Sequence, residues 1–342
     1  MKRISRRDFL RLLALSTGTL TLNQLLAACG LKPGSSLPTK TPTLFLPTNE
    51  VQTATSTVAP ALNATTISTP LPPPDLAVAR GGEPEDLVRR AIAAFGGMEK
   101  FVPKGANVVV KPNICVAYHN YKYAATTNPW VVGTLVKLCF EAGAGSVKVM
   151  DFPFGGTAQE AYKISGIKEQ VEAAGGEMAY MPTYKYVPVK LDNPISQKSV
   201  FVAEEIMKAD VLINVPIAKH HSLTRLTLGM KNLMGVVRDR QILHYNIGQN
   251  LAYISKFVRP ELTVVDAVRI LLANGPTGGN LDDVKQLDTV IISPDIVAAD
   301  SYAATLFGLR PSDLSYIRAG TEIGLGRSDL ENLKIEEITV GA

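Results

Sequence analysis

From about residue 76 to the end of the chain, short apolar runs alternate with amphipathic stretches. Residues 107–110 (Asn-Val-Val-Val) and 211–215 (Val-Leu-Ile-Asn-Val) are apolar and rich in β-branched residues, a pattern typical of strands buried on both faces of a parallel sheet. Further strands are predicted at residues 76–79, 146–151, 262–266 and 289–292, and a hairpin at residues 186–203.

Helices are predicted between these strands, where apolar residues recur three and four positions apart. They are residues 83–95, 129–142, 158–174 with an interruption near Gly166, and 295–307. Asn128 and Pro129 are a typical helix start, because an Asn side chain caps the first turn and proline fits the first helical position. The alternation predicts an α/β fold, a mostly parallel sheet in three layers with helices on both faces.

The first 28 residues have a different pattern. Ser5-Arg6-Arg7-Asp8-Phe9-Leu10 precedes an apolar run that ends in Leu26-Ala27-Ala28-Cys29. The arginine pair resembles a twin-arginine export signal and the second motif resembles a bacterial lipobox, so we expect residues 1–28 to be a signal peptide and Cys29 to be lipidated. An ordinary helix or a membrane span is the alternative, but polar residues break up the apolar run, which is too short and too polar to span well.

Residues 29–75 are rich in Pro, Thr and Ser and carry almost no charge. Such a composition does not bury enough apolar surface to fold, so it predicts a disordered tether. A flexible chain of about 45 residues would hold the α/β domain, residues 76–342, on the order of 35–40 Å from its anchor. We therefore expect a membrane-anchored, extracytoplasmic protein whose partners are the membrane, through lipid on Cys29, and the twin-arginine export machinery.

The formal charge of +4 belongs to the signal segment. Residues 1–28 carry Lys2, Arg3, Arg6, Arg7 and Arg11 against Asp8 alone. The rest of the chain is therefore formally neutral, and it contains neither a basic block nor a basic face interleaved with aromatic residues. No nucleic-acid partner is expected.

Polar residues follow the predicted strands, and the carboxyl ends of parallel strands meet at one edge of a sheet. Lys111 and Asn113 follow one strand, Asp151 ends another, and Asn214 lies near the end of a third. Turn chemistry or a solvated lysine would explain each one singly. Their convergence at one edge predicts a shared pocket.

Residues 214–240 contain the densest group of cationic and imidazole side chains, which are Lys219, His220, His221, Arg225 and Lys231. Few acids are nearby in the sequence, so a small anionic ligand is expected to supply the missing charge. The predicted ligand-binding residues are Lys111, Asn113, Asp151, Asn214, Lys219, Lys231 and Asn232.

His220 and His244 are the candidates for acid–base catalysis, since imidazole titrates near neutral pH. A metal site is the rival use. His220 and His221 would point apart on a strand, but His244 could join one of them with Asp151 or Asp266 as the carboxylate. In a purely structural alternative the histidines cap helices and the lysines are solvated. The cofactor stays open, and a bound metal or a nucleotide is compatible with the pattern.

The chain resembles the bacterial family called domain of unknown function 362 over almost all of residues 76–341. Order and spacing agree at residues 110–113 (Val-Lys-Pro-Asn), 126–129 (Thr-Thr-Asn-Pro), 214–220 and 229–235 (Gly-Met-Lys-Asn-Leu-Met-Gly). The family has no assigned reaction, so the resemblance implies the domain and leaves its chemistry open. Many members add cysteine-rich iron–sulfur motifs. Here only Cys115 and Cys139 remain beside Cys29, too few for a four-cysteine cluster, and whether they form a disulfide is open.

A weaker similarity is to the lactate racemase type of fold, in which a lysine and histidines hold a nickel-pincer nucleotide. It would imply an anchoring role for Lys219 or Lys231 and an acid–base role for His220 or His244. Two function classes remain. An enzyme or cofactor protein should pair a histidine with a carboxylate in a closed cleft, whereas a non-catalytic surface lipoprotein that binds an anionic solute or docks a redox partner should show the cations without such a pair.

Overall fold

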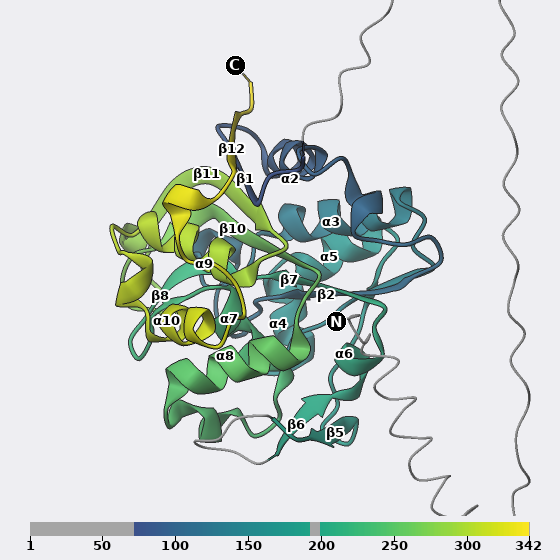
Figure 1. Cartoon of the computed structure of the whole chain (residues 1–342). Coiled ribbons are helices and arrows are strands. Elements are labelled where there is room, and N and C mark those ends of the chain that lie inside the picture. Colours follow the sequence, from purple (N-terminus) through teal and green to yellow (C-terminus); the bar gives the residue numbers. More distant parts are fainter. Residues whose placement is uncertain (1–71, 192–198, 342) are drawn as a thin grey trace, which may run out of the picture. The chain divides into compact units, whose positions relative to one another are not determined.

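A computed structural model of the chain describes residues 72–191 and 199–341 (Figure 1). The predicted signal peptide, the lipidation site Cys29 and the predicted tether up to residue 71 lie outside the described residues. Asp75, the last residue of the predicted tether, contacts the folded domain. Its N–H donates to the Lys334 carbonyl at 2.9 Å, and its carbonyl accepts from Ser293 Oγ at 2.7 Å. No helix within the described ranges combines the length and the apolarity needed to cross a membrane.

One mixed sheet forms the centre of the domain. Its strands are β1 (Leu76–Arg80), β2 (Asn107–Pro112), β3 (Ser146–Val149), β4 (Glu177–Met178), β7 (Val211–Val215), β8 (Ile217–His221), β9 (Arg225–Thr227), β10 (Leu262–Leu271), β11 (Val284–Ser293) and β12 (Ile335–Thr339). Their order is β12-β1-β11-β10-β7-β2-β3-β4, and β8 pairs with both β10 and β9. The predicted hairpin is a separate antiparallel pair of β5 (Tyr186–Val189) and β6 (Val200–Ala203).

The sheet is mostly parallel, as the sequence predicts. From β10 through β7, β2 and β3 to β4, all neighbours run in the same direction. The departures are β11, which runs antiparallel to both β1 and β10, and β9, which runs antiparallel to β8. Every residue of β7 is buried, in agreement with its continuous apolar run.

Helices cover both faces of the sheet (Figure 1). They are α2 (Pro84–Ala93), α3 (Pro129–Glu141), α4 (Ala158–Ile164), α5 (Ile167–Ala173), α6 (Glu204–Lys208), α7 (Gly229–Asn232), α8 (Ile247–Val258), α9 (Ile296–Thr305) and α10 (Ser315–Glu322). Helices α2 and α3 pack on one face beside α5, while α7 and α9 pack on the other, with α8 and α10 against them. The predicted three-layer α/β arrangement is confirmed.

Short 3-10 turns connect several of these elements. They are η1 (Met98–Lys100), η2 (Tyr121–Tyr123), η3 (Leu233–Val236), η4 (Arg240–His244), η5 (Leu281–Asp283), η6 (Pro311–Asp313) and η7 (Leu330–Asn332). The dense cationic segment is divided between the strands β8 and β9, which carry Lys219, His220, His221 and Arg225, and the helix α7 with the turns η3 and η4, which carry Lys231 and Arg240. That segment therefore lies partly in a hairpin of the sheet and partly in short helical turns.

Local sequence signals define the helix ends. Asn128 caps α3, because its Oδ1 accepts from the Trp130 N–H at 3.0 Å. Gly166 separates α4 from α5 with a φ of 78°, a conformation that costs glycine little. Asp295 caps α9 by accepting from the N–H groups of Val297 and Ala298 at 2.8 and 3.1 Å. These caps place the helices over the sheet and leave its carboxyl edge to the connecting loops.

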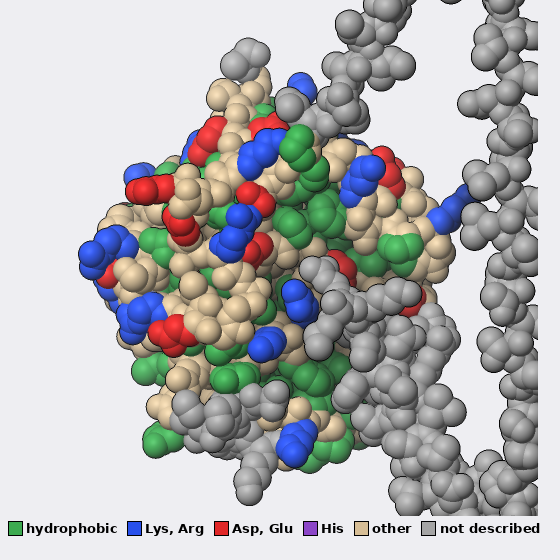
Figure 2. All heavy atoms as spheres, in the orientation of Figure 1, with side chains coloured by type: hydrophobic (Ala, Val, Ile, Leu, Met, Phe, Trp, Pro, Cys, Tyr) green, Lys and Arg blue, Asp and Glu red, His purple; other side chains and the backbone are tan. Residues whose placement is uncertain are grey.

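The main apolar core lies between the sheet and the helices α2, α3 and α5. Leu87, Ile92 and Leu135 pack there against Val110 and Ile213, and all five are 0–1% exposed. On the face shown in Figure 2, Lys and Arg side chains are interspersed with Asp and Glu side chains. This face therefore has no large area of a single charge sign among its described residues.

Candidate functional site

A cavity of about 430 Å³ lies at the carboxyl ends of β2, β3 and β8. Its walls are the loops after β2 and β3, the β8–β9 hairpin, and the segment from α7 to η4. The structure brings these predicted site residues into its lining: Asn113, Asp151, Lys219, Lys231, Asn232 and His244. Lys111 and Asn214 lie behind this lining, and His220 is directed elsewhere.

Lys111 forms a buried ion pair with Asp151. Its Nζ lies 2.6 Å from Asp151 Oδ1 and also donates to the Pro112 carbonyl at 3.0 Å and to Asn232 Oδ1 at 3.1 Å. Burial lowers the pKa of Lys111, and the Asp151 carboxylate opposes that shift. Because an ammonium has three N–H donors and all are used, Lys111 supports the cavity floor instead of neutralising a ligand, which corrects the role predicted from the sequence.

Asn232 holds the floor together through both ends of its amide. Its Oδ1 accepts from Asn113 Nδ2 at 3.0 Å as well as from Lys111. Its Nδ2 donates to Asn214 Oδ1 at 2.9 Å, and Asn214 Nδ2 donates to the Gly229 carbonyl at 3.0 Å. Asn214 is fully buried, so it acts on the cavity through Asn232. Asn113 Oδ1 is buried and has no hydrogen-bond partner among the described residues.

Asp300 fixes the start of α7 from the neighbouring helix α9. Its two carboxylate oxygens accept from the N–H groups of Gly229 at 2.6 Å and Met230 at 2.9 Å. A Cβ on Gly229 would lie 2.7 Å from Asp300 Oδ1, so only glycine allows this approach. Burial raises the pKa of Asp300 to about 7. Asp300 thereby positions the short helix that carries Lys231 and Asn232.

Lys219 is buried at the back of the cavity. Its Nζ donates to the Ala125 carbonyl at 2.5 Å and to the Pro276 carbonyl at 2.9 Å. The thiol of Cys115 donates to the same Pro276 carbonyl at 3.4 Å. Burial lowers the pKa of Lys219. The Gly-Pro turn at residues 275–276 therefore contributes a wall of the cavity.

Lys231 and Arg240 carry positive charge with no carboxylate bound to it. Within residues 72–191 and 199–341, the Lys231 ammonium has neither a hydrogen bond nor an ion pair. Burial, followed by the nearby charges of Lys219 and Arg240, lowers its pKa to about 8. Arg240 Nη1 donates to the Phe152 carbonyl at 2.8 Å. Asp151 is the carboxylate in the described lining, and Lys111 already neutralises it.

The two neighbouring histidines of β8 point to different places. His221 lines the cavity, and its Nδ1 accepts from the Leu223 N–H at 3.1 Å. His220 does not line it, and its Nδ1 accepts from the Gly275 N–H at 3.0 Å. The prediction that His220 lies in the pocket is therefore wrong, because successive strand residues face opposite sides.

The surroundings of the cavity histidines favour the neutral form of their rings, which can donate and accept hydrogen bonds but carries no charge. Burial, and then the positive charges of Lys231 and Lys219, lowers the pKa of His221 to about 3. Its ring is therefore neutral, and with Nδ1 acting as an acceptor we assign the proton to Nε2. Burial and the charges of Lys231 and Arg240 also lower the pKa of His244, which is exposed at the cavity mouth. In the described part of the chain, no imidazole is hydrogen-bonded to a carboxylate.

Asp151, Asp266, His220 and His221 were considered for a metal site, and each of them has another hydrogen-bond partner. Across the described ranges, no three His, Cys, Asp or Glu side chains are grouped closely enough to hold a metal ion. Asp266 accepts from the N–H groups of Asn128 at 2.6 Å and Val268 at 3.0 Å, so it supports the start of α3. Cys115 and Cys139 are separate free thiols.

Several lining residues were not predicted from the sequence as site residues, namely Cys115, Phe152, Phe154, Thr227 and Arg240, while His221 was considered only as part of the cationic group and as a possible metal ligand. Thr227 is 4% exposed, and its Oγ1 has no hydrogen-bond partner in the described part of the chain. Arg225 was considered as a cation of the site, but it is exposed and outside the lining. Arg240 is the last residue of the dense cationic segment, and this position in the sequence was the one indication that it could belong to the site.

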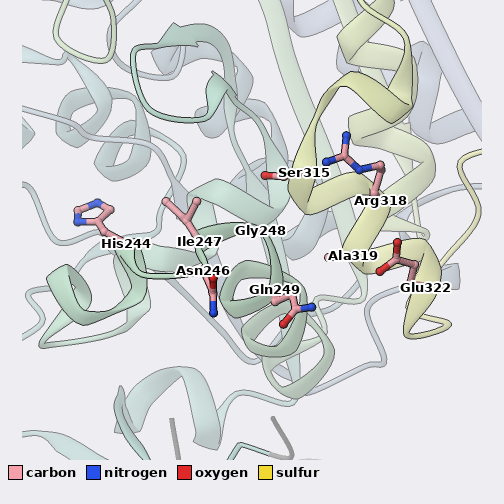
Figure 3. A pocket seen from close by; sticks show the side chains of 9 residues that line it. All are labelled: His244, Asn246, Ile247, Gly248, Gln249, Ser315, Arg318, Ala319 and Glu322. Atoms are coloured by element: carbon pink, nitrogen blue, oxygen red, sulfur yellow. The ribbon is translucent and has the colours of Figure 1, made fainter. Parts of the chain in front are cut away.

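A second cavity, of about 550 Å³, lies beside α8 and α10. Figure 3 shows His244 at one end of it, with the imidazole turned away from Arg318 and Glu322. Apart from His244 it contains none of the predicted site residues. The cavity at the sheet edge is the better candidate, because it combines buried polar atoms that lack partners with uncompensated positive charge.

Comparison with known proteins adds three kinds of match. The model of the family described as "Domain of unknown function (DUF362)" matches residues 108–305, which include the cavity floor and Asp300. A Synechocystis sp. protein named as thylakoid-associated is 26% identical over 253 residues, covering 71% of this chain and 76% of that protein.

Two solved structures align with the chain at low similarity. The lactate racemase apoprotein of Thermoanaerobacterium thermosaccharolyticum aligns with a TM-score of 0.41 and 13% identity, over 62% of this chain and 53% of that one. A protein of Thermotoga maritima aligns with a TM-score of 0.38 and 9% identity, over 66% and 60% of the two chains. The present chain thus matches only 53% and 60% of the lengths of these two proteins.

Proposed function

The chain belongs to the family described as Domain of unknown function (DUF362), and we propose that its α/β domain binds a small anionic ligand or cofactor in the cavity at the carboxyl edge of the sheet. The observation that carries this proposal is the uncompensated positive charge. Lys219, Lys231 and Arg240 line the cavity, whereas the carboxylate of Asp151 is neutralised by Lys111. An anion would supply the missing charge.

The pKa shifts support the same proposal. The pKa values of Lys231, about 8, and His221, about 3, are lowered first by burial and then by neighbouring cations. Neighbouring cations in a partly buried space repel one another, and this repulsion disfavours their charged forms. A bound anion would offset the repulsion and part of the cost of desolvation. Perturbed groups gathered in one cavity are typical of a functional site.

The lining residues divide into those that contact the ligand and those that position them. Lys231 and Arg240 would bind the anionic group, with hydrogen bonds from His221 Nε2 and the hydroxyl of Thr227. Lys111, Asn214 and Asp300 hold the floor and α7 in place through the hydrogen bonds described above. The ligand would thus bind to a preorganised site, which reduces the entropy lost on binding.

Acid–base catalysis by His244 is the alternative. His244 lies at the cavity mouth and is exposed, so it would exchange protons readily with solvent. A general base normally has an orienting partner, and in the described residues no carboxylate is bonded to an imidazole. This arrangement favours binding of an anionic solute or cofactor over histidine catalysis.

We extend the proposal to the location of the protein in the cell, on the basis of the export motif and the lipobox. With Cys29 lipidated, the domain would be held outside the cytoplasm at a membrane surface by residues 29–75. The anionic ligand would then be one that is available in that compartment. The motifs are the support for this part of the proposal.

Isothermal titration calorimetry with acetate and with inorganic phosphate tests the binding proposal. Lys231→Met should weaken binding of both anions by about 1.5–3 kcal/mol, the range for a hydrogen bond to a charged group. Lys163→Met is the matched control, because Lys163 is exposed on α4 and outside the lining. Absence of binding by either anion, or equal effects of the two substitutions, would contradict the proposal.

A further inference from the structure

The cavity has a polar floor and an apolar mouth. Thr227 and Asn113 contribute buried oxygens without partners in the described residues, and Lys231 adds the unpaired ammonium. At the mouth, Phe154 and Leu223 are 56% and 55% exposed although both line the cavity. A ligand that satisfied both regions would need a charged group at one end and an apolar surface at the other.

Arg240 connects the two regions. Its guanidinium lies 5.0 Å from the ring centroid of Phe152 and 5.8 Å from that of Phe154. A guanidinium beside aromatic rings offers a flat surface for stacking together with a positive charge for an anion. Single exposed apolar residues are ordinary, but these rings surround the same cation and line the same cavity.

The cavity is also larger than a bare anion requires. A water molecule occupies about 30 Å³, and acetate or phosphate is only a few times larger. Most of the 430 Å³ would therefore remain filled with water if such an ion bound alone. Covering the exposed part of Phe154 would release water from apolar surface, which favours binding.

We infer that the ligand combines an anionic group with a flat, aromatic body, as in an aryl carboxylate or an aryl phosphate. This inference rests on the proposed function and names the ligand class for the same cavity. The anionic group would bind Lys231 and the floor, while the ring would stack against Phe154 and Arg240 at the mouth. Carboxylate and phosphate share the charge chemistry used here, so the experiment includes both.

Calorimetry with two matched pairs of probes tests the inference. Benzoate is compared with acetate, and phenyl phosphate with inorganic phosphate. The aromatic member of each pair should bind about tenfold more tightly, which corresponds to about 1.4 kcal/mol, since the ring adds aromatic contacts to the burial of apolar surface. Cyclohexanecarboxylate, which is apolar but not flat, should bind more weakly than benzoate.

Substitutions test which residues produce the preference for the aromatic probes. Phe154→Ala should remove the preference for the aromatic probes while acetate and phosphate still bind, and Lys231→Met should weaken both members of each pair. Tyr184→Ala is the control, because Tyr184 is 82% exposed and outside the lining, so the preference should persist.

The outcomes separate the two proposals. Equal affinities for the aromatic and the simple anions, or for benzoate and cyclohexanecarboxylate, would overturn the aromatic inference while leaving anion binding intact. A preference that survives Phe154→Ala would also overturn it, because the ring would then bind elsewhere. Failure of every anion to bind would overturn the proposed function and this inference with it.

Discussion

Lys111 Nζ lies 2.6 Å from Asp151 Oδ1, in a pair whose side chains are 0% and 5% exposed. Lys111 belongs to β2 and Asp151 follows β3, so the pair joins two adjacent parallel strands at their carboxyl ends. The Ile114 N–H donates to the other carboxylate oxygen at 2.6 Å. Because these charges cancel within the floor, the excess charge of the cavity is that of Lys219, Lys231 and Arg240.

Breaking this buried pair should destabilise the domain strongly. Lys111→Met leaves the Asp151 carboxylate buried without its cation, and loss of one partner from a buried pair costs about 3–5 kcal/mol in the free energy of unfolding. Urea unfolding followed by circular dichroism measures this change.

A surface pair provides the control for that measurement. Lys168 and Glu172 form an ion pair four residues apart on α5, and both side chains are about half exposed. Lys168→Met should therefore change the free energy of unfolding by less than about 1 kcal/mol. Similar changes in the free energy of unfolding for Lys111→Met and Lys168→Met would show that the buried Asp151 carboxylate is not stabilised by Lys111.

Asp300 predicts a pH dependence of stability. Burial raises its pKa from 3.8 to about 7. Between these values the unfolded chain has already lost the proton that the folded protein keeps, so the contribution of Asp300 to the free energy of unfolding falls as the pH rises from about 4 to 7. Asp300→Asn removes this contribution, so the stability of the wild type relative to the variant should decline over this range and then level off.

Asp266→Asn is the matched comparison for that titration. Burial raises the pKa of Asp266 to about 6, so the corresponding decline should end about one pH unit earlier. Urea unfolding at a series of pH values gives both curves. Parallel wild-type and Asp300→Asn curves between pH 4 and 7 would mean that Asp300 has an ordinary pKa in the folded state.

Lys231 predicts a pH dependence of anion binding. Its pKa of about 8 means that the ammonium loses its proton as the pH rises through that value. The affinity for benzoate, whose own charge is constant in this range, should then fall by up to about tenfold per pH unit. Calorimetry between pH 7 and 9 should show this decline, and binding to Lys231→Met should be weaker and nearly independent of pH. An equally steep decline in the variant would assign the titration to another group.

The general architecture and the place of the cavity could be predicted from the sequence because both follow from regular patterns. Continuous apolar runs predict buried parallel strands, and polar residues after such strands meet at one edge. This reasoning brought Asn113, Asp151 and Lys219 together although they are far apart in the chain. The antiparallel direction of β11 was not predicted, since its apolar residues would suit either direction.

The details of the site depend on contacts that local patterns do not contain. Alternation along a strand separates His220 from His221, but the pairing of β8 with β10 and β9 decides which of them lines the cavity. The carboxylate that pairs with Lys111 follows the neighbouring strand β3. The sequence around Lys111 therefore did not show that all three N–H donors of its ammonium would be used. Phe154 and Arg240 lie in loops and short turns, where no hydrophobic period indicates their direction.

Cys29 predicts membrane attachment. If the lipobox is processed, Cys29→Ser removes the acylated residue, and the protein should move from the membrane fraction to the soluble fraction. Fractionation and immunoblotting of cells that express the full chain measure the distribution. Cys139→Ser is the control, because Cys139 is a buried free thiol of the folded domain and should leave attachment unchanged. Retention of Cys29→Ser in the membrane fraction would refute lipid anchoring at this residue.

The export route is tested by the arginine pair rather than by the cysteine. Replacing Arg6 and Arg7 with Lys keeps the charge of the signal segment but removes both guanidinium groups, whose planar donor geometry an ammonium does not reproduce. A twin-arginine route should therefore leave the unprocessed precursor in the cytoplasm. The control variant replaces Arg3 and Arg11 with Lys outside the pair, and it should be exported normally. Normal export of both variants would instead indicate the general secretory route, because that route requires positive charge near the N-terminus but no arginine pair.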